Sequence, residues 1–191
     1  MKFTEININN FRQYYNNVNI DLTTNSERNI ILIGGKNGYG KTNLLLSVVW
    51  CLYGEKISQV DENFKREIQK EKNYSLFMKQ SINTTAKNEN KNIFSVDLMI
   101  SEIELPHIQS LKKSTNSIRI KREFNVSSMD ETLSISDPIS NTELFADDFD
   151  KINFINDYVI PLDAAKFVFF DAEKIAEIAN LSIKDEGSFI F

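Results

Sequence analysis

The sequence predicts an α/β fold whose sheet mixes parallel and antiparallel strands. Residues 30–33 form a continuous apolar run, which is typical of a strand buried on both faces, as parallel strands usually are. A glycine-rich loop follows this run, and residues 44–52 after the loop are apolar on nearly every side of a helix. Residues 93–100 and 118–126 alternate between apolar and polar side chains, which indicates antiparallel strands with one solvated face.

The N-terminal half is expected to contain two half-buried strands before the buried strand and the helix. Apolar residues alternate over 3–9 and again over 18–22, with asparagine-rich turns between the two segments. The helix after the loop should end at Gly54, because glycine readily adopts the left-handed conformation of a helix C-cap. Residues 55–80 carry charges of both signs and indicate solvated helices or loop, while the polar stretch 84–92 indicates an exposed turn or a disordered tip.

The C-terminal half adds a third short antiparallel strand at residues 133–135. The pattern Ser-x-x-Glu at 140–143 resembles a capping box and predicts the start of a helix that Pro161 ends. Residues 166–170 predict a last apolar strand, and 172–179 a short helix. A strictly alternating β-α-β order is missing, which disfavours a small kinase or GTPase and favours a nucleotide-binding lobe with a mixed sheet.

Composition places this chain among ordinary cytoplasmic proteins of one domain. It has 191 residues, of which 41% are hydrophobic and 26% charged. Its single cysteine, Cys51, excludes an internal disulfide and a thiolate cluster for a metal. The sequence has neither the apolar run of a signal peptide nor a stretch long enough to cross a membrane. The net charge of −5 gives no global attraction to nucleic acid, so any contact with DNA requires a local patch.

The last five residues, 187–191, include three large apolar side chains and no charged group. Chain ends are usually polar and solvated. We therefore expect this sequence to be a piece of a longer protein or to be completed by a partner. A natural end buried in its own core is the alternative.

The glycine-rich loop matches the phosphate-binding pattern G-x-x-x-x-G-K-[ST] between a predicted strand and a predicted helix. Its glycines, at 35, 38 and 40, should adopt positive φ and let backbone N–H groups converge on an anion at the helix N-terminus. The expected ligand is ATP with Mg²⁺. The residues predicted to bind it are Gly35, Lys36, Asn37, Gly38, Tyr39, Gly40, Lys41, Thr42 and Asn43. A glycine-rich turn without a ligand is the alternative.

Three of these residues have specific expected roles. The ammonium group of Lys41 should neutralise the β- and γ-phosphates, which makes it the first candidate catalytic residue. The Thr42 hydroxyl should ligate Mg²⁺. The side chain of Asn43 can reach back to the α-phosphate.

The N-terminal segments resemble the start of an SMC/RecF-type ATPase head. Residues 9–12 read Asn-Asn-Phe-Arg, residues 37–42 read Asn-Gly-Tyr-Gly-Lys-Thr, and the helix ends in Leu-Tyr-Gly at 52–54. That family has an N-F-R/K element, then an N-G-x-G-K-[ST] loop, then an LYG helix end. Residues 118–122, Ile-Arg-Ile-Lys-Arg, match a strand of these heads in pattern only.

A second segment, Phe-Phe-Asp-Ala-Glu-Lys-Ile at 169–175, resembles the FFDGEKI segment of the DndD family, the ATPase subunits of bacterial DNA phosphorothioation systems. Ala172 stands where that family has glycine, and the chain contains no LSGG signature. In this family the signature and the Walker B carboxylates lie beyond a long coiled coil.

The resemblance implies an ABC/SMC-type P-loop ATPase lobe with residues 1–191 as the N-terminal half of the head. It implies ATP hydrolysis that requires the C-terminal half of the same head, and a homodimer formed on ATP binding. DNA and other DNA-modification subunits are the further partners that it implies. Three functions remain open: DNA sulfur modification, a nucleotide-gated DNA clamp of repair or defence type, and a self-contained small NTPase.

Three residues outside the loop are candidates through the resemblance. Arg12 would contact the nucleotide phosphates, and a surface arginine is the alternative. Asp171 and Glu173 occupy the place of the Q-loop, with Asp171 as a metal ligand. Alternatively, Asp171 caps a helix, or Asp171 and Glu173 form a Walker B pair in which Asp171 holds Mg²⁺ and Glu173 polarises the attacking water.

The remaining charged and rare residues have weaker claims to function. A basic group could contact a DNA backbone, but interleaved glutamates indicate a solvated face with i,i+4 pairs. Its members are Lys65, Arg66, Lys70, Lys72 and Lys79. His107 has no second ligand for a metal nearby in sequence, and Trp50 and Cys51 are expected in the core.

Overall fold

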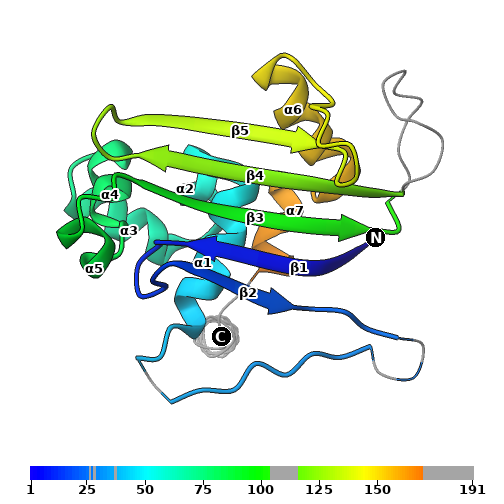
Figure 1. Ribbon diagram of the computed structural model, residues 1–191, viewed down its shortest axis with the longest axis horizontal. Coiled ribbons are helices and arrows are strands. Elements are labelled where there is room, and N and C mark those ends of the chain that lie inside the picture. Colours follow the sequence, from blue (N-terminus) through cyan, green and yellow to red (C-terminus); the bar gives the residue numbers. More distant parts are fainter. Residues whose placement is uncertain (26, 28, 37, 104–115, 170–191) are drawn as a thin grey trace, which may run out of the picture.

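A five-stranded antiparallel sheet organises the fold (Figure 1). The structure is a computed structural model that describes residues 1–25, 27, 29–36, 38–103 and 116–169. The strand order is β2-β1-β3-β4-β5, and each neighbouring pair is antiparallel. The strands are β1 (Lys2–Asn9), β2 (Asn17–Asp21), β3 (Ile93–Ser101), β4 (Ser117–Asn125) and β5 (Asp130–Ser136).

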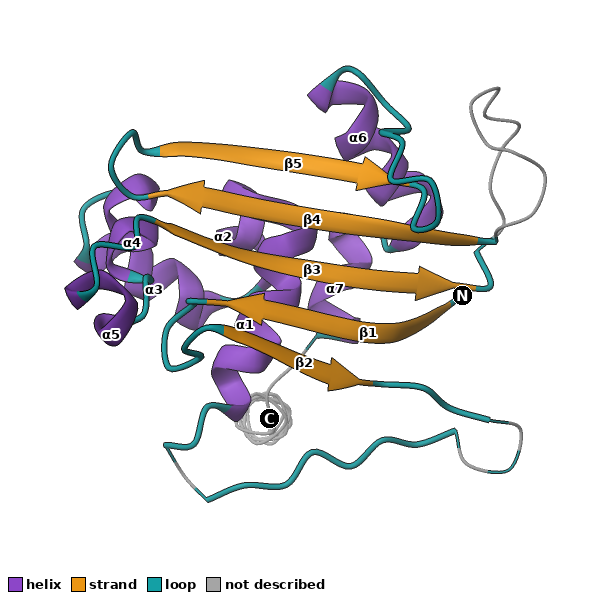
Figure 2. Ribbon diagram, viewed as in Figure 1, coloured by secondary structure: helices purple, strands orange, loops and turns teal. Residues whose placement is uncertain are grey.

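Helices cover one face of this sheet and gather at one of its ends. Figure 2 shows α1, α2 and α7 behind the strands, with α3, α4 and α5 grouped together. The helical elements are α1 (Lys41–Tyr53), η1 (Gly54–Lys56), α2 (Ile57–Val60), α3 (Glu62–Lys70), α4 (Tyr74–Gln80), α5 (Thr84–Asn88), α6 (Asp148–Phe154), η2 (Ile155–Val159) and α7 (Leu162–Val168). No helix in the described ranges combines the length and hydrophobicity needed to cross a bilayer.

The two faces of the sheet differ in polarity, as the alternating sequence predicts. Every second residue of β3 and β4 is buried, and the residues between them are half-buried and largely polar. Val96 pairs with Arg122 and Asp97 with Lys121 in the register of these strands. The large buried side chains of the two strands are Phe94, Val96, Leu98, Ile100, Ile118, Ile120 and Phe124. This inner face packs on α1, so the core lies between the sheet and that helix.

The helix α1 is buried on most of its surface, which confirms the prediction from its apolar sequence. Trp50 stacks on Phe11 with ring centroids 5.4 Å apart, and its ring lies 5.2 Å from Phe94. Cys51 is fully buried, and burial raises the pKa of its thiol to about 12. Both residues therefore belong to the core, as expected.

The C-terminus of α1 is held by a buried ion pair. Arg122 donates from Nε to the Cys51 carbonyl at 3.0 Å and from Nη2 to the Leu52 carbonyl at 3.3 Å, which satisfies carbonyls that a helix end leaves without partners. Its Nη1 lies 2.6 Å from Oε1 of Glu131 on β5. Gly54 ends the helix with φ of 53°, so the predicted C-cap is confirmed.

Replacing Gly54 by alanine is expected to lower the free energy of unfolding by about 2 kcal/mol. Alanine would have to adopt the positive φ of Gly54, and its Cβ would lie 2.6 Å from both Nη1 of Arg122 and Oε1 of Glu131. Urea unfolding measures the effect. Gly34→Ala is the control, because a Cβ there meets no described atom within 4 Å, and its effect should stay within about 0.5 kcal/mol. Equal losses in the two variants would contradict this account of Gly54.

The prediction of mixed parallel and antiparallel strands is wrong for the described part of the chain, where the sheet is antiparallel throughout. Residues 30–33 form no strand, and Ile30 is 85% exposed and Leu32 94% exposed. Residues 166–168 lie in α7 and form no strand. A parallel strand needs a neighbour for its backbone hydrogen bonds, and no described segment pairs with 30–33.

The predicted capping box at 140–143 is also wrong, because its glutamate contacts the sheet. Oε1 of Glu143 accepts the Ile135 backbone N–H at 2.9 Å, and Glu143 forms an isolated bridge with Ser136. The helix α6 begins only at Asp148, with Asp147 as its N-cap. Residues 84–88, expected in an exposed turn, form α5 with Asn83 as the N-cap.

Candidate phosphate-binding site

The glycine-rich loop leads directly into the N-terminus of α1, as the sequence predicts. Gly40 is the N-cap with φ of 96°, and it accepts the Leu44 backbone N–H at 2.9 Å. Gly38 also has positive φ, at 83°, whereas Gly35 does not, so the expectation of positive φ is wrong for that glycine. The first turn of α1 has no side-chain cap and no acidic residue. Its N–H groups and the positive end of the helix dipole therefore suit an anion.

Lys41 is folded back over the loop. Its Nζ donates to the carbonyl of Gly35 at 2.7 Å and to the carbonyl of Lys36 at 3.1 Å. These two contacts hold the ammonium group across the loop that the sequence assigns to phosphates. Phosphate oxygens are stronger acceptors for an ammonium group than neutral carbonyls, so they can replace both contacts.

Two residues that sequence reasoning missed support the last glycine of the loop. The Tyr14 hydroxyl donates to the Gly40 carbonyl at 3.1 Å. The Gln13 side chain lies over Gly40, where a Cβ would overlap its amide, and its Oε1 accepts from Nδ2 of Asn43 at 2.5 Å. A side chain at position 40 would thus displace the Gln13 side chain and would have to adopt the positive φ of Gly40. Both residues follow Arg12 directly, but neither residue type carries a signal of its own for this contact.

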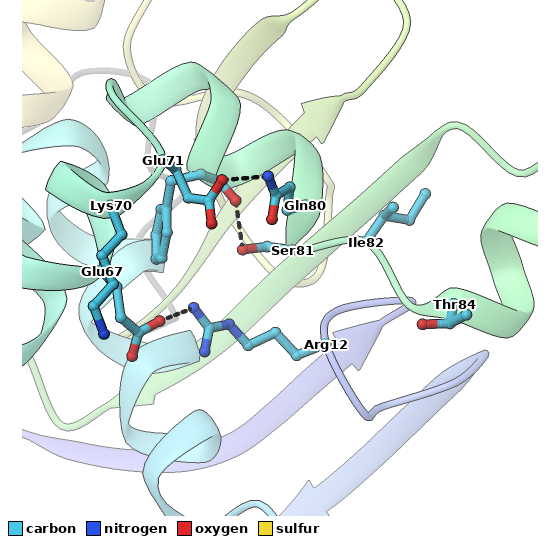
Figure 3. A pocket seen from close by; sticks show the side chains of 9 residues that line it. Arg12, Glu67, Lys70, Glu71, Gln80, Ser81, Ile82 and Thr84 are labelled. Atoms are coloured by element: carbon cyan, nitrogen blue, oxygen red, sulfur yellow. Dashed lines mark hydrogen bonds and ion pairs between the residues drawn. The ribbon is translucent and has the colours of Figure 1, made fainter.

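Arg12 lies at the same end of α1. Its Nη1 donates to Oδ1 of Asn43 at 2.9 Å. Its Nη2 forms an ion pair with Oε2 of Glu67 at 2.7 Å, which Figure 3 shows. The guanidinium carbon lies 5.2 Å from the centre of the Phe77 ring. The structure therefore brings together Arg12 and Asn43, each of which the sequence assigns to the nucleotide phosphates. Glu67 and Phe77 were not predicted, because no local pattern links residues so far apart in sequence.

Two more of the predicted site residues, Thr42 and Tyr39, lie in the part of the chain that the structure describes. Thr42 lies in the first turn of α1, and Tyr39 in the loop is 73% exposed. Asn37, Asp171 and Glu173 lie outside the described residues, so their predicted roles stay predictions.

Within the described residues, no group of three or more histidine, cysteine, aspartate or glutamate side chains could hold a metal ion. A P-loop holds Mg²⁺ mainly through a hydroxyl and phosphate oxygens, so such a cluster is not required. The residues present are therefore compatible with Mg²⁺ bound together with a nucleotide.

The basic group of Lys65, Arg66, Lys70, Lys72 and Lys79 contains a surface ion pair at i,i+3 spacing, whereas the sequence predicts i,i+4 pairs. Nζ of Lys65 lies 3.3 Å from Oε1 of Glu62, three residues earlier. Lys70 instead lines a cavity of about 300 Å³ that also contains Arg12 and Glu67. His107 lies outside the described residues.

Comparisons with known proteins agree with this α/β P-loop ATPase lobe. No curated protein matches the sequence. A solved structure described as "Structural biochemistry of ATP-driven dimerization and DNA stimulated activation of SMC ATPases" matches with a TM-score of 0.53 and 14% identity, over 93% of this chain and 97% of that chain. At this identity the match shows a shared fold. Residues 5–186 match the family model of the AAA domain, so this chain belongs to the AAA domain family.

Proposed function

We propose that this chain binds ATP with Mg²⁺ as the N-terminal half of an SMC-like ATPase head that acts on DNA in the cytoplasm. The observation that carries the proposal is the loop at the N-terminus of α1, where the N-cap Gly40 has no side chain, with Lys41 folded over the loop and Arg12 beside Asn43. Two cationic side chains and a row of backbone N–H groups then converge on one end of a buried helix. Such a convergence suits a polyphosphate.

Each residue has a role in this proposal. Lys41 would exchange the carbonyls of Gly35 and Lys36 for β- and γ-phosphate oxygens, and Arg12 would add a second cation. The Thr42 hydroxyl would ligate Mg²⁺. When bound, this ion would neutralise the charge that develops on the phosphates during phosphoryl transfer. Asn43, already bonded to Arg12 and Gln13, would keep the arginine near the α-phosphate.

An exposed apolar segment supports the half-head part of the proposal. Ile30, Ile31, Leu32 and Ile33 precede the loop, and all four side chains are exposed. A contiguous apolar surface of this kind marks an interaction site. Phe167 of α7 adds a further apolar side chain that is 72% exposed. We propose that the C-terminal half of the head supplies strands that pair with residues 30–33.

The proposed partners of this chain are a second copy of it and DNA. The solved structure with the shared fold is described in terms of ATP-driven dimerization and stimulation by DNA. We extend both properties to this chain as proposals: a homodimer that forms on ATP binding, and a contact with DNA in the complete protein. The net charge of −5 means that the contact requires a local basic patch.

DNA sulfur modification of the DndD type is the specific pathway that we propose. It rests on the sequence of residues 169–175, of which only Phe169 lies in the described part. Other DNA-modification subunits would then be partners. A nucleotide-gated DNA clamp is the alternative. Neighbouring genes for a cysteine desulfurase and a sulfurtransferase would favour sulfur modification, and their absence would favour the clamp.

Isothermal titration calorimetry with Mg·ATP tests the nucleotide-binding proposal directly. The expected result is a binding heat that the unaltered chain shows and the Lys41→Ala variant lacks. A chain that gives no such heat, alone or with its complementary half, would overturn the proposal.

The chain alone is expected to hydrolyse ATP more slowly than about 1 s⁻¹, the lower end of the usual enzyme range. By the family resemblance, the general base and the signature serine belong to the other half. The half-head should therefore show no turnover at or above that rate for Asp171→Ala to abolish, and Asp163→Ala on α7 is the matched control. If Asp171→Ala alone abolishes turnover at or above that rate, the chain is a self-contained NTPase.

A further inference from the structure

The Arg12 backbone is held in a conformation that few non-glycine residues adopt. Its φ is 48°, in the left-handed region. Its N–H donates to the Ser81 carbonyl at 2.7 Å, and its carbonyl accepts from Nδ2 of Asn83 at 2.7 Å. Phe11, the preceding residue, bridges to Ile82 and stacks on Trp50. The segment after α4 therefore fixes the point from which the arginine side chain starts.

The guanidinium group is fixed at the other end by three contacts. The Phe77 ring, Oδ1 of Asn43 and Oε2 of Glu67 surround it, and only 20% of the Arg12 side chain is exposed. Figure 3 shows the side chain extending from its loop to Glu67 on α3. An arginine has five N–H donors, so pairing with Asn43 and Glu67 leaves others for a ligand. The ion pair and a phosphate contact are thus compatible.

We propose that Glu67 is a positioning residue for Arg12, which holds the guanidinium group at the N-terminus of α1 ready to contact nucleotide phosphate. This inference rests on the proposed nucleotide-binding function. Glu67 contacts the arginine and not the ligand. It acts by removing the rotamer freedom that a long side chain would otherwise lose on binding.

Positioning and simple electrostatics predict opposite effects when Glu67 loses its charge. If charge alone mattered, Glu67→Gln would leave more positive charge near the phosphates and tighten binding. The Glu67 side chain is 40% exposed, so solvent screens much of the repulsion between its carboxylate and a phosphate. The ordering of Arg12 is therefore the larger effect, and the substitution should weaken binding.

Calorimetry with Mg·ATP tests the proposal. Glu67→Gln is expected to raise the dissociation constant about fivefold. Glu71→Gln is the matched control: Glu71 lines the same cavity but bonds to the Gln80 side chain, so its loss should leave binding unchanged. In an Arg12→Ala background, Glu67→Gln should cause no further loss, because its effect passes through Arg12.

Several results would overturn this role for Glu67. Unchanged or tighter binding by Glu67→Gln is one, and an equal loss in the presence and absence of Arg12 is another. A lower melting temperature of Glu67→Gln, matched by a loss of binding in both backgrounds, would assign Glu67 a structural role. If the unaltered chain shows no binding that Lys41→Ala removes, the proposed function fails and this inference fails with it. If that binding is present, only the role of Glu67 is in question.

Discussion

Replacing Lys41 by alanine is expected to weaken Mg·ATP binding at least about 100-fold, equivalent to about 3 kcal/mol. Among the described residues, its Nζ donates to the carbonyls of Gly35 and Lys36, within the loop itself. Losing these two exposed hydrogen bonds has little effect on stability. Losing a charge-assisted contact with phosphate oxygens has a large effect on binding. Lys41→Ala should therefore lose Mg·ATP binding and keep nearly the stability of the unaltered chain.

A matched control for Lys41→Ala is Lys65→Ala on α3. Lys65 pairs with Glu62 on the surface, and its side chain is 48% exposed. Its removal changes the net charge by the same amount, but it lies outside the loop. Equal weakening of Mg·ATP binding by the two variants would show that general electrostatic attraction accounts for binding, and that the loop does not form a specific site.

The parts of the fold that were predicted correctly depend on local signals. The helix α1 could be placed from its apolar sequence, its start from the glycine-rich loop and its end from Gly54. The alternation of β3 and β4 gave both their positions and their buried faces. In each case, residues within a few positions of one another determine the conformation, so a single sequence contains the necessary information.

The parts that were missed depend on partners distant in sequence. Residues 30–33 have the composition of a buried strand, but a strand forms only where another strand pairs with it. The ion pair of Arg12 with Glu67 joins residues 55 positions apart. Glu143 is an exception, because it fits a capping-box pattern but binds the backbone of β5 only 8 positions earlier in the sequence. A local pattern cannot show which of several distant acceptors or strands is close in space.

Replacing Leu32 by lysine is expected to have little effect on the stability of the isolated chain and a large effect on assembly of the complete head. In this chain the Leu32 side chain is 94% exposed, so Leu32→Lys should change the free energy of unfolding by less than about 0.5 kcal/mol. In the proposed head, residues 30–33 form a strand covered on both faces. A lysine there would lose its hydration without an acceptor, which should weaken assembly of the two halves by at least about 3 kcal/mol.

Urea unfolding of this chain and a binding assay between the two halves of the head measure the two effects of Leu32→Lys. Ile139→Lys is the control, because Ile139 is also exposed, at 74%, but lies in the turn after β5. It should affect neither measurement. If Leu32→Lys assembles as well as the unaltered chain, residues 30–33 do not form the proposed strand. The exposed run would then need another explanation, such as a rearrangement that buries it within this chain. In that case Leu32→Lys would destabilise the chain on its own, which the urea experiment detects.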